Sequence, residues 1–396
     1  MSEKVVRDPI HGNIRLDGAF LGLLDTPQMQ RLRNIKQNGL CYLVYPAMNS
    51  TRFEHSLGVF HLGGSISEHL QLDESDEMEL KAACLLHDVG HGPFSHTFDE
   101  LMLRHGFDHE GESARIINET EISDMMGKAG IKPKAVVELI YGRGKLGKLL
   151  SSEVDVDKMD YLVRDAYYAG VAYGVTDVER LLYSIRFEKG DVLVESGGLE
   201  AAESLLINRN MMYQTVYRHH AKRIAESMMT HALGRLIEDG SDPIALARMD
   251  DIGLISKMRM STGYAQDMMA RLDCRRLFKN AYSENIHLLT EESKKELAEN
   301  TVAIEAKMAK EHGIDEGYLL LDYPETSMNE YRVKVKTPHG LKSISEVSQL
   351  AKSLEGSEKE KLTVNIYVRP QDRQKLSEFS PEDYFTYKQT RISGFI

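Results

Sequence analysis

One short stretch of the chain, CLLHDVGHGPFSH at residues 84–96, contains three histidines and an aspartate. Imidazole and carboxylate groups are common ligands of hydrolytic divalent metals, whose sites keep one position open for water or substrate. His87 and Asp88 are adjacent, so both can face one ion only where a helix ends, and Gly90 and Gly92 permit such an end. Taken alone, the pair is more typical of a helix cap with its hydrogen-bond partner.

Residues on either side supply further candidates. In TRFEHSLG, Arg52 and His55 stand three residues apart near the start of an expected helix, so the guanidinium and the imidazole can face the same side. Further along, DVDKMDYLVRD sets four polar side chains on one helical face: Asp157, Tyr161, Arg164 and Asp165. Such a stripe is also typical of a solvated helix with ion pairs, although Val156 and Leu162 beside it favour partial burial.

Helices are expected to position most of these residues. Cap residues followed by apolar residues at helical spacing predict helices over residues 25–37, 49–70, 76–88, 154–169 and 198–236. The segment around DPIHGNI, within residues 1–17, alternates polar and apolar residues and predicts a hairpin or an extended arm. SIRFEKGDVLVE predicts a second hairpin, with Lys189 and Gly190 at its turn.

The chain changes character towards its C-terminus. It stays helical and charged to about residue 313, after which YRVKVK and LTVNIYVRP predict two strands that flank a helix near 343–354. The expected fold class is therefore mainly α, with a helical core and a small C-terminal α+β lobe. The expected domains are an N-terminal arm at 1–20, a catalytic core at 21–240, a helical extension at 241–320 and the α+β lobe at 321–396.

Composition narrows the class of ligand. The 396 residues carry a net charge of −12, so the surface as a whole repels nucleic acid and anionic membranes, and a small anion must be bound by a local group of cations. Three widely spaced cysteines fit reduced thiols rather than a disulfide framework. No apolar stretch has the length of a signal-peptide core or of a membrane span, so we expect a cytoplasmic protein.

The order His55, His87, Asp88 and Asp157 resembles the H…HD…D signature of the HD-domain phosphohydrolases. Longer blocks resemble the deoxynucleoside triphosphate triphosphohydrolase branch, which includes the bacterial dGTPases and the mammalian dNTPase restriction factor. These blocks are DPIHGNI, DTPQMQRLRNIKQNGLCYLVYPAMNSTRFEHSLGV, LLHDVGHGPFSH and DVDKMDYLVRDAYYAG, and the similarity covers about residues 4–240.

The resemblance implies one divalent ion per active site, with the four signature residues as its ligands: His55, His87, Asp88 and Asp157. Mixed nitrogen and oxygen donors suit Fe, Mn, Ni, Co or Zn, whereas Mg would accompany the bound nucleotide. The resemblance also implies a catalytic group made of His91, His96, Asp99 and His109, with His109 near the α-phosphate and the leaving 5′-oxygen. His96 is equally open to a purely structural role.

The resemblance further implies a nucleotide substrate that is cleaved at the α-phosphorus. The positions that match triphosphate-binding residues are Arg52, Lys158 and Arg209, and those beside the sugar are Gln37, Asp165 and Tyr217; Tyr161 is a further substrate-binding candidate. Tyr217 would pack where a ribose 2′-hydroxyl would clash. Asn38 departs from the family pattern, because the mammalian relatives carry an aliphatic residue there.

Three residues near the N-terminus match positions that bind an activating guanine nucleotide in regulated relatives: Asp25, Gln30 and Arg33. Arginine suits guanine O6 and N7, and aspartate can accept from its N1 and N2 hydrogens. The resemblance implies a homo-oligomer, a tetramer or a dimer, with such sites between subunits. Arg7 stands where the mammalian protein has an amide, and a plain surface helix remains an alternative.

Two other functions remain open at the level of sequence. One is an HD phosphohydrolase that acts on a different phosphoester, and the other is a nucleotide sensor without turnover. Three cations favour a polyphosphate over a monophosphate, and an intact set of signature residues favours catalysis over sensing.

Overall fold

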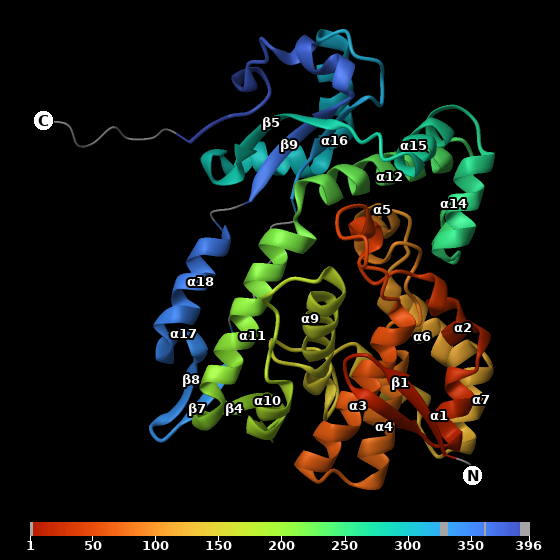
Figure 1. Cartoon of the computed structure of the whole chain (residues 1–396), viewed down its shortest axis with the longest axis vertical. Helices are drawn as coiled ribbons and strands as arrows, with labels where there is room; N and C mark the ends of the chain where they lie inside the picture. Colours follow the sequence, from red (N-terminus) through yellow and green to blue (C-terminus); the bar gives the residue numbers. More distant parts are fainter. Residues whose placement is uncertain (1–2, 325–331, 360–361, 389–396) are drawn as a thin grey trace, which may run out of the picture. The chain divides into compact units, whose positions relative to one another are not determined.

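The computed structural model describes residues 3–324, 332–359 and 362–388, and it is mainly α-helical, as the sequence predicts (Figure 1). The chain divides into two compact units. The first consists of residues 1–219, 236–258 and 329–354, and the second of residues 220–235, 259–328 and 355–396. All the predicted site residues belong to the first unit. Within the described residues, no helix combines the length and the apolar character that a membrane span requires.

The first unit begins with the expected hairpin, in which β1 (Lys4–Asp8) pairs antiparallel with β2 (Gly12–Leu16). A series of helices follows: α1 Gly18–Leu24, α2 Pro27–Arg31, α3 Arg52–Leu70, α4 Glu74–Leu86, α5 Asp99–Leu103, α6 His109–Glu119, α7 Glu121–Lys128, α8 Pro133–Ile140, α9 Val156–Ala169, α10 Val178–Ser184, α11 Leu199–Met212, α13 Pro243–Ala247 and α14 Asp251–Met260. Short 3₁₀ turns at Leu32–Asn34, Gly39–Leu43, Ser95–Phe98, Gly147–Leu149 and Ser196–Gly198 connect several of them.

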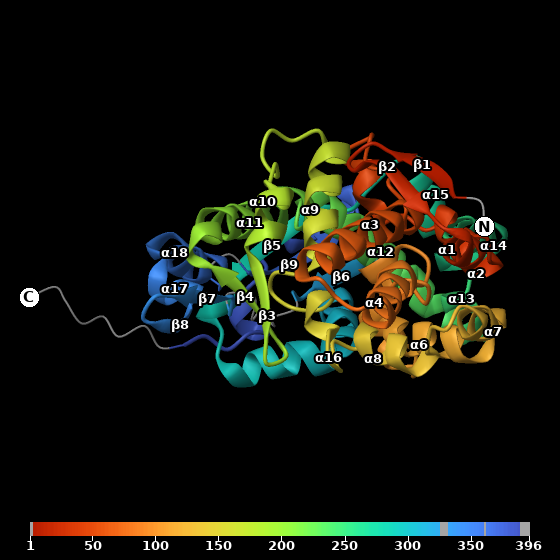
Figure 2. The same ribbon diagram turned by 90° about the horizontal axis from the view of Figure 1, so that it is seen from below.

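The helices that matter most for the site begin at capped positions. Thr51 and Glu54 form a capping box at the start of α3, and Asp155 caps α9 by accepting a hydrogen bond from the backbone N–H of Lys158 at 2.7 Å. Gly170 ends α9 at a positive φ of 68°, which glycine adopts without strain. α3 packs against both α4 and α9 (Figures 1 and 2), so the beginnings of α3 and α9 and the end of α4 lie close together.

A four-stranded sheet completes the first unit. β3 (Ile185–Glu188) and β4 (Asp191–Glu195) form the predicted hairpin, with Lys189 and Gly190 both at positive φ in the turn. β7 (Lys334–Thr337) lies parallel to β4, and β8 (Gly340–Ser343) pairs with β7. The short helices α17 (Ile344–Val347) and α18 (Gln349–Lys359) follow.

The second unit has its own core and sheet. Its helices are α12 His220–Glu238, α15 Gly263–Asp273 and α16 Glu291–Glu311, and its strands β5 Lys279–Asn285, β6 Leu319–Asp322 and β9 Thr363–Val368 form an antiparallel sheet in the order β5-β9-β6. 3₁₀ turns lie at Ile286–Leu288, Pro370–Leu376 and Pro381–Asp383. The strands predicted in YRVKVK and LTVNIYVRP therefore both exist, but β7 and β9 belong to different sheets and different units.

The prediction of a single long helix over 198–236 is wrong in one respect. α11 ends at Met212, a π-helical turn covers Tyr213–Tyr217, and α12 begins at His220. The backbone N–H of Arg218 bonds to the carbonyl of Tyr213 at 2.9 Å, which is the wider i→i+5 pattern of a π turn. Apolar spacing continues on both sides of the turn, so periodicity alone gives no sign of it. π turns of this kind are frequent at functional sites.

Candidate active site

Four side chains from three helices form what we call the ligand cluster: His55, His87, Asp88 and Asp157. His55 lies in the first turn of α3, His87 and Asp88 directly follow α4, and Asp157 lies in the first turn of α9. Nε2 of His55 is 2.9 Å from Oδ1 of Asp157 and 3.6 Å from Oδ2 of Asp88, and Nε2 of His87 is 3.3 Å from Oδ1 of Asp88. The sequence prediction that these four positions converge is therefore consistent with the geometry.

Both histidines of the ligand cluster are held through Nδ1 of the ring. Nδ1 of His55 lies 2.8 Å from Oδ2 of Asp160, and Nδ1 of His87 lies 2.9 Å from the carbonyl of Cys84. Because a carboxylate and a carbonyl can only accept, each Nδ1 must carry the proton. Each Nε2 then presents a lone pair to the centre of the cluster, as metal-ligating histidines do.

The chemistry of this donor set fits a divalent ion. Nε2 of His55 and Nε2 of His87 are buried and face the carboxylates of Asp88 and Asp157, but neither makes a hydrogen bond of good geometry in the described structure, which is costly unless something else binds them. One donor atom each from His55, His87 and Asp88 lies within 4.8 Å of the others, and the side chain of Asp157 is 30% exposed. The cluster can therefore hold a metal ion, with an opening to solvent on the side of Asp157.

The electrostatics of the cluster favour added positive charge. Burial lowers the pKa of His55, but the neighbouring carboxylates of Asp157 and Asp160 raise it to about 10. Burial acts to raise the pKa of Asp88, yet the charges of Arg52 and His87 hold it well below its usual value. The carboxylates of Asp88 and Asp157 thus face the centre of the cluster. Without a metal they favour protonated histidines, and a bound divalent cation would replace those protons.

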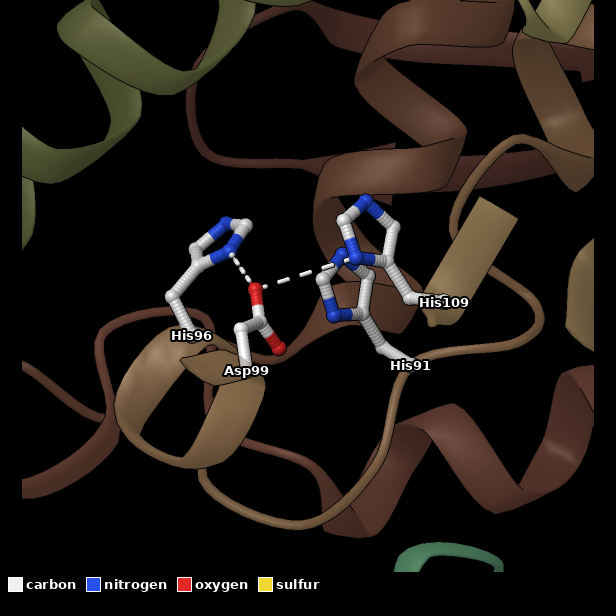
Figure 3. Close-up of side chains that lie close together, drawn as sticks. All are labelled: His91, His96, Asp99 and His109. Atoms are coloured by element: carbon white, nitrogen blue, oxygen red, sulfur yellow. Dashed lines mark hydrogen bonds and ion pairs between the residues drawn. The ribbon is translucent and has the colours of Figure 1, made fainter. Parts of the chain in front are cut away.

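A second group of side chains, the histidine cluster, lies beside the first and consists of His91, His96, Asp99 and His109 (Figure 3). Nδ1 of His96 lies 2.7 Å from Oδ2 of Asp99, and Nδ1 of His109 lies 3.7 Å from the same oxygen. The rings of His91 and His109 stack, with centroids 4.0 Å apart and planes 12° apart. Nε2 of His91 is 3.4 Å from Oδ1 of Asp88, so His91 connects the two clusters.

The histidines of this cluster differ in their surroundings. His91 is buried, and burial together with the charge of Arg52 lowers its pKa well below the usual value. Burial and the neighbouring His96 lower the pKa of His109 as well. The side chain of His96, by contrast, is 64% exposed and pairs with Asp99, a carboxylate that orients the imidazole.

An unusual backbone turn carries the chain from His91 to His96. Phe94 and Ser95 both have positive φ, at 57° and 54°, which is strained for residues other than glycine. Asp251, at the start of α14, accepts a hydrogen bond from the N–H of Phe94 at 2.7 Å and another from the N–H of Lys36 at 3.0 Å. The turn is thus held by a buried carboxylate more than 150 residues away along the chain.

Three cations were predicted to bind phosphate, and the structure places each of them in a defined contact. Arg52 pairs with Asp88 and donates from Nε to Oγ of Ser95 at 2.8 Å, while its buried Nη2 meets no hydrogen-bond partner among the described residues. Nζ of Lys158 is 3.0 Å from Asp155. Arg209 is almost fully buried, and its guanidinium lies 4.4 Å from the ring centre of Tyr213. Arg52 is therefore the cation most directly attached to the ligand cluster.

The residues predicted to contact the sugar also meet. Oη of Tyr217 donates to Asp165 at 2.7 Å, and Nδ2 of Asn38 donates to the other oxygen of the same carboxylate at 2.7 Å. Burial raises the pKa of Asp165 to about 6, although both hydrogen bonds act to lower it. Tyr161 packs edge-on to Tyr217 at 6.5 Å. Oε1 of the buried Gln37 has no partner in the described structure, so this acceptor is available to a ligand.

The residues predicted to bind a guanine nucleotide lie near α2. Nε of Arg33 donates to Oε1 of Gln30 at 2.7 Å, and its guanidinium stacks on Phe53 at 3.6 Å. Nε2 of Gln30 donates to the carbonyl of Leu24 at 2.8 Å. Asp25 lies at the exposed C-terminal end of α1. The structure thus joins Gln30 and Arg33 directly and sets Asp25 at a neighbouring helix end.

Sequence reasoning missed several residues that support the site. Asp160 and His11 lie behind His55, Asp251 and Ser95 support the strained turn, and Arg31 donates to the carbonyl of His91 at 2.6 Å. For two of them a signal existed, because His11 lies in the DPIHGNI block and Asp160 lies one helical turn after Asp157. Asp251 stands in a charged helical stretch that gives no such signal.

Comparison with known proteins agrees with this geometry. The HD domain model matches residues 52–165, the segment that supplies the whole ligand cluster, and the HD associated region model matches residues 176–393. The chain therefore belongs to the HD-domain family of phosphohydrolases. Within that family it falls in the branch that resembles the deoxynucleoside triphosphate triphosphohydrolases.

Individual relatives cover different shares of the chain. An uncharacterised protein of Methanocaldococcus jannaschii is 37% identical over 391 residues, which are 96% of this chain and 82% of that protein. The human deoxynucleoside triphosphate triphosphohydrolase SAMHD1 is 32% identical over 275 residues, 58% of this chain but only 44% of its own length. A hypothetical protein from Aquifex aeolicus, of known crystal structure, has a TM-score of 0.79 at 33% identity, covering 95% of this chain and 100% of that one.

Proposed function

We propose that this protein hydrolyses deoxynucleoside triphosphates to the deoxynucleoside and inorganic triphosphate, with a divalent ion held by the ligand cluster. The observation that carries the proposal is the pair of buried Nε2 atoms of His55 and His87, which converge with the carboxylates of Asp88 and Asp157 next to Arg52 and the histidine cluster. A bound ion would supply Lewis-acid stabilisation of charge on the phosphate oxygens and a water of lowered pKa. The relatives named for this activity support the substrate class.

Other residues of the chain bind the triphosphate and the sugar. Arg52, Lys158 and Arg209 bind and neutralise the triphosphate, since each phosphate oxygen carries charge that a guanidinium or an ammonium can pair. Gln37 and Asp165 bind the sugar 3′-hydroxyl. Tyr217, which donates to Asp165, packs beside the sugar and disfavours a 2′-hydroxyl.

A proton must reach the leaving group. In the proposed reaction a water oxygen forms a bond to the α-phosphorus, the bond from that phosphorus to O5′ breaks, and the O5′ electron pair takes up a proton. We assign this role to His96: in its imidazolium form, Asp99 accepts from Nδ1, and the proton on Nε2 is the one transferred to O5′. His109 and His91 stack beside it on the α-phosphate side.

The test of this function is product analysis. Purified protein is incubated with each dNTP in the presence of Mn²⁺, Co²⁺ or Mg²⁺, and the products are resolved by ion-exchange chromatography. Deoxynucleoside and tripolyphosphate in equal amounts are the expected result. A nucleoside monophosphate, or orthophosphate alone, would instead identify a different phosphoesterase, and an unchanged dNTP with every metal would indicate a sensor.

We further propose that a guanine nucleotide bound near Gln30 and Arg33 activates the enzyme and that the active form is a homo-oligomer. A contact between this helix and the active site supports the proposal. Arg31, also on α2, donates hydrogen bonds to the carbonyls of Val89 and His91. Addition of GTP or dGTP should raise the rate of dNTP hydrolysis and shift the mass measured by light scattering upwards. Equal rates and equal mass with and without either nucleotide would refute the activation.

A further inference from the structure

Asp160 lies behind the ligand cluster at the centre of a buried hydrogen-bond network. It belongs to α9, one turn after Asp157, and both its carboxylate and the side chain of Arg164 are fully buried. Oδ2 of Asp160 accepts from Nδ1 of His55 at 2.8 Å and from Nε of Arg164 at 2.9 Å. Oδ1 accepts from Nη2 of Arg164 at 2.9 Å and lies 2.6 Å from Nε2 of His11.

The network reaches back to the N-terminal hairpin. Nη1 of Arg164 donates to Oδ2 of Asp8 at 2.8 Å, and Oδ1 of Asp8 accepts from the backbone N–H groups of Ile10 and His11. The turn between β1 and β2 is thereby ordered so that the imidazole of His11 points at Asp160. All the hydrogen-bonding positions of the Asp160 carboxylate are directed at named partners, which favours a single orientation of the group.

One helix therefore contacts both ring nitrogens of His55. Asp157 lies beside Nε2 and Asp160 beside Nδ1, at 2.9 and 2.8 Å, so the imidazole is held between two carboxylates of α9. A carboxylate on Nδ1 fixes the tautomer, orients the ring and increases its basicity toward a metal. Removing Asp157 removes a ligand, whereas removing Asp160 alters only the way in which a ligand is held.

The close approach of α3 and α9 depends on Gly58. A Cβ atom at this position would lie 1.8 Å from Oδ1 of Asp160 and 2.5 Å from Nη2 of Arg164, distances at which Asp160 must move. Gly58 stands one turn after His55 on α3, so the space that it leaves is the space that the carboxylate occupies. Gly64 of the same helix has only the side chain of Lys81 near it, at 4.0 Å, and offers a matched control.

We propose that Asp160 is a positioning residue for the metal ligand His55, and that His11 of the N-terminal hairpin completes its hydrogen bonds so that the hairpin is part of the metal-site support. The inference rests on the proposed function, because it takes His55 to be a ligand. It assigns to the hairpin turn a role in metal affinity that the ligand cluster by itself does not require.

Metal binding measured without substrate tests the inference. Apo protein is titrated with Co²⁺, and the dissociation constant and the visible absorption spectrum are recorded for Asp160→Asn and Gly58→Ala, with Gly64→Ala as the control. We expect about a 10- to 100-fold loss of Co²⁺ affinity and a shifted spectrum in the first two variants, which is the usual effect of losing a group that orients a ligand. Gly64→Ala should match the unmodified protein. Unchanged affinity in both Asp160→Asn and Gly58→Ala would overturn the inference.

Because Asp160 is buried with Arg164, its variants can fail to fold. Two substitutions of His11, which is only partly buried, provide a milder second test. His11→Gln keeps a hydrogen-bond donor facing Asp160, whereas His11→Ala removes it. We expect His11→Ala to lose about tenfold in Co²⁺ affinity and His11→Gln to recover most of that loss, with equal melting temperatures. Equal affinity in the two variants would contradict the role of His11.

The failure of this inference and the failure of the proposed function give different results. If the ligand cluster is not a metal site, Asp157→Ala will bind Co²⁺ as tightly as the unmodified protein. If only the positioning role is wrong, Asp157→Ala will lose the ion while Asp160→Asn and His11→Ala retain it.

Discussion

The ligand cluster and the histidine cluster are neighbours that are held in place in different ways. His55, His87 and Asp157 lie at the ends of regular helices, and the two histidines each have one ring nitrogen bonded to a fixed acceptor. His96 is instead reached through a turn with two residues at positive φ, and it is 64% exposed. The first cluster is thus suited to fixed coordination, and the second to contact with a ligand that enters and leaves.

This contrast separates two kinds of defect. Changes in the ligand cluster should abolish ion binding and turnover together. Changes in the histidine cluster should reduce turnover while the ion stays bound, and changes in the strained turn should have smaller effects still.

The largest effect is expected for Asp157→Ala. Loss of a carboxylate ligand removes several kcal/mol of charge stabilisation, so kcat should fall by at least ~10³-fold, and the bound metal measured by mass spectrometry should fall with it. Circular dichroism should be unchanged. Asp124→Ala, an exposed carboxylate of α7, is the matched control and should keep full activity and metal. Full activity in Asp157→Ala would refute the ligand assignment.

His96→Ala should come next. Loss of a general acid lowers kcat by roughly 10²- to 10⁴-fold, while metal content and KM stay near those of the unmodified protein. His105→Ala, an exposed histidine a few residues away, serves as the control. A loss of metal in His96→Ala would show that the histidine cluster also contributes to ion binding.

Ser95→Ala tests the contact between the strained turn and Arg52. Oγ of Ser95 accepts from Nε of Arg52 and donates to the carbonyl of Lys36 at 2.7 Å. A hydrogen bond to a charged group is worth about 1.5–3 kcal/mol, so we expect KM for dNTP to rise by roughly tenfold or more. Ser67→Ala on α3, where the hydroxyl bonds only within its own helix, should leave KM unchanged. An unaltered KM in Ser95→Ala would show that the contact between Ser95 and Arg52 does not contribute to substrate binding.

The smallest effect concerns stability. Burial raises the pKa of Asp251 to about 6, despite the hydrogen bonds from Phe94 and Lys36, compared with about 4 for an unfolded aspartate. The folded state therefore binds an extra proton between about pH 4 and 6, and the free energy of unfolding falls as the pH rises through that window. Between pH 4 and pH 7, the free energy of unfolding of the unmodified protein should fall by up to about 3 kcal/mol more than that of Asp251→Asn. Parallel pH profiles in chemical denaturation would contradict this shift.

The sequence predicted the parts of the site that lie on regular helices. The helix over 154–169 and the helix end before His87 follow from caps and apolar spacing, and the positions of His55, His87, Asp88 and Asp157 follow from the family resemblance. The π turn at Tyr213–Tyr217 was not predictable, because it adds one residue to a turn without changing the apolar pattern. Neither was the placement of β7 in the sheet of β4, a parallel pairing across about 140 residues.

The supporting residues were missed for a common reason. Asp160 and His11 are 149 positions apart and Asp251 and Phe94 are 157 positions apart, so neither pair forms a local pattern. Their importance appears only when the tertiary structure sets a buried carboxylate against an imidazole or a backbone N–H. Local spacing identifies ligands on helices, but the groups that orient those ligands come from elsewhere in the fold.

Isotope labelling of the products tests which bond of the dNTP is broken. A dNTP is hydrolysed in water enriched in oxygen-18, with Mn²⁺ present, and the products are separated and analysed by mass spectrometry. We expect one heavy oxygen in the tripolyphosphate and none in the deoxynucleoside, because water attacks the α-phosphorus and the bond to O5′ breaks. Heavy oxygen in a nucleoside monophosphate or in orthophosphate would contradict it.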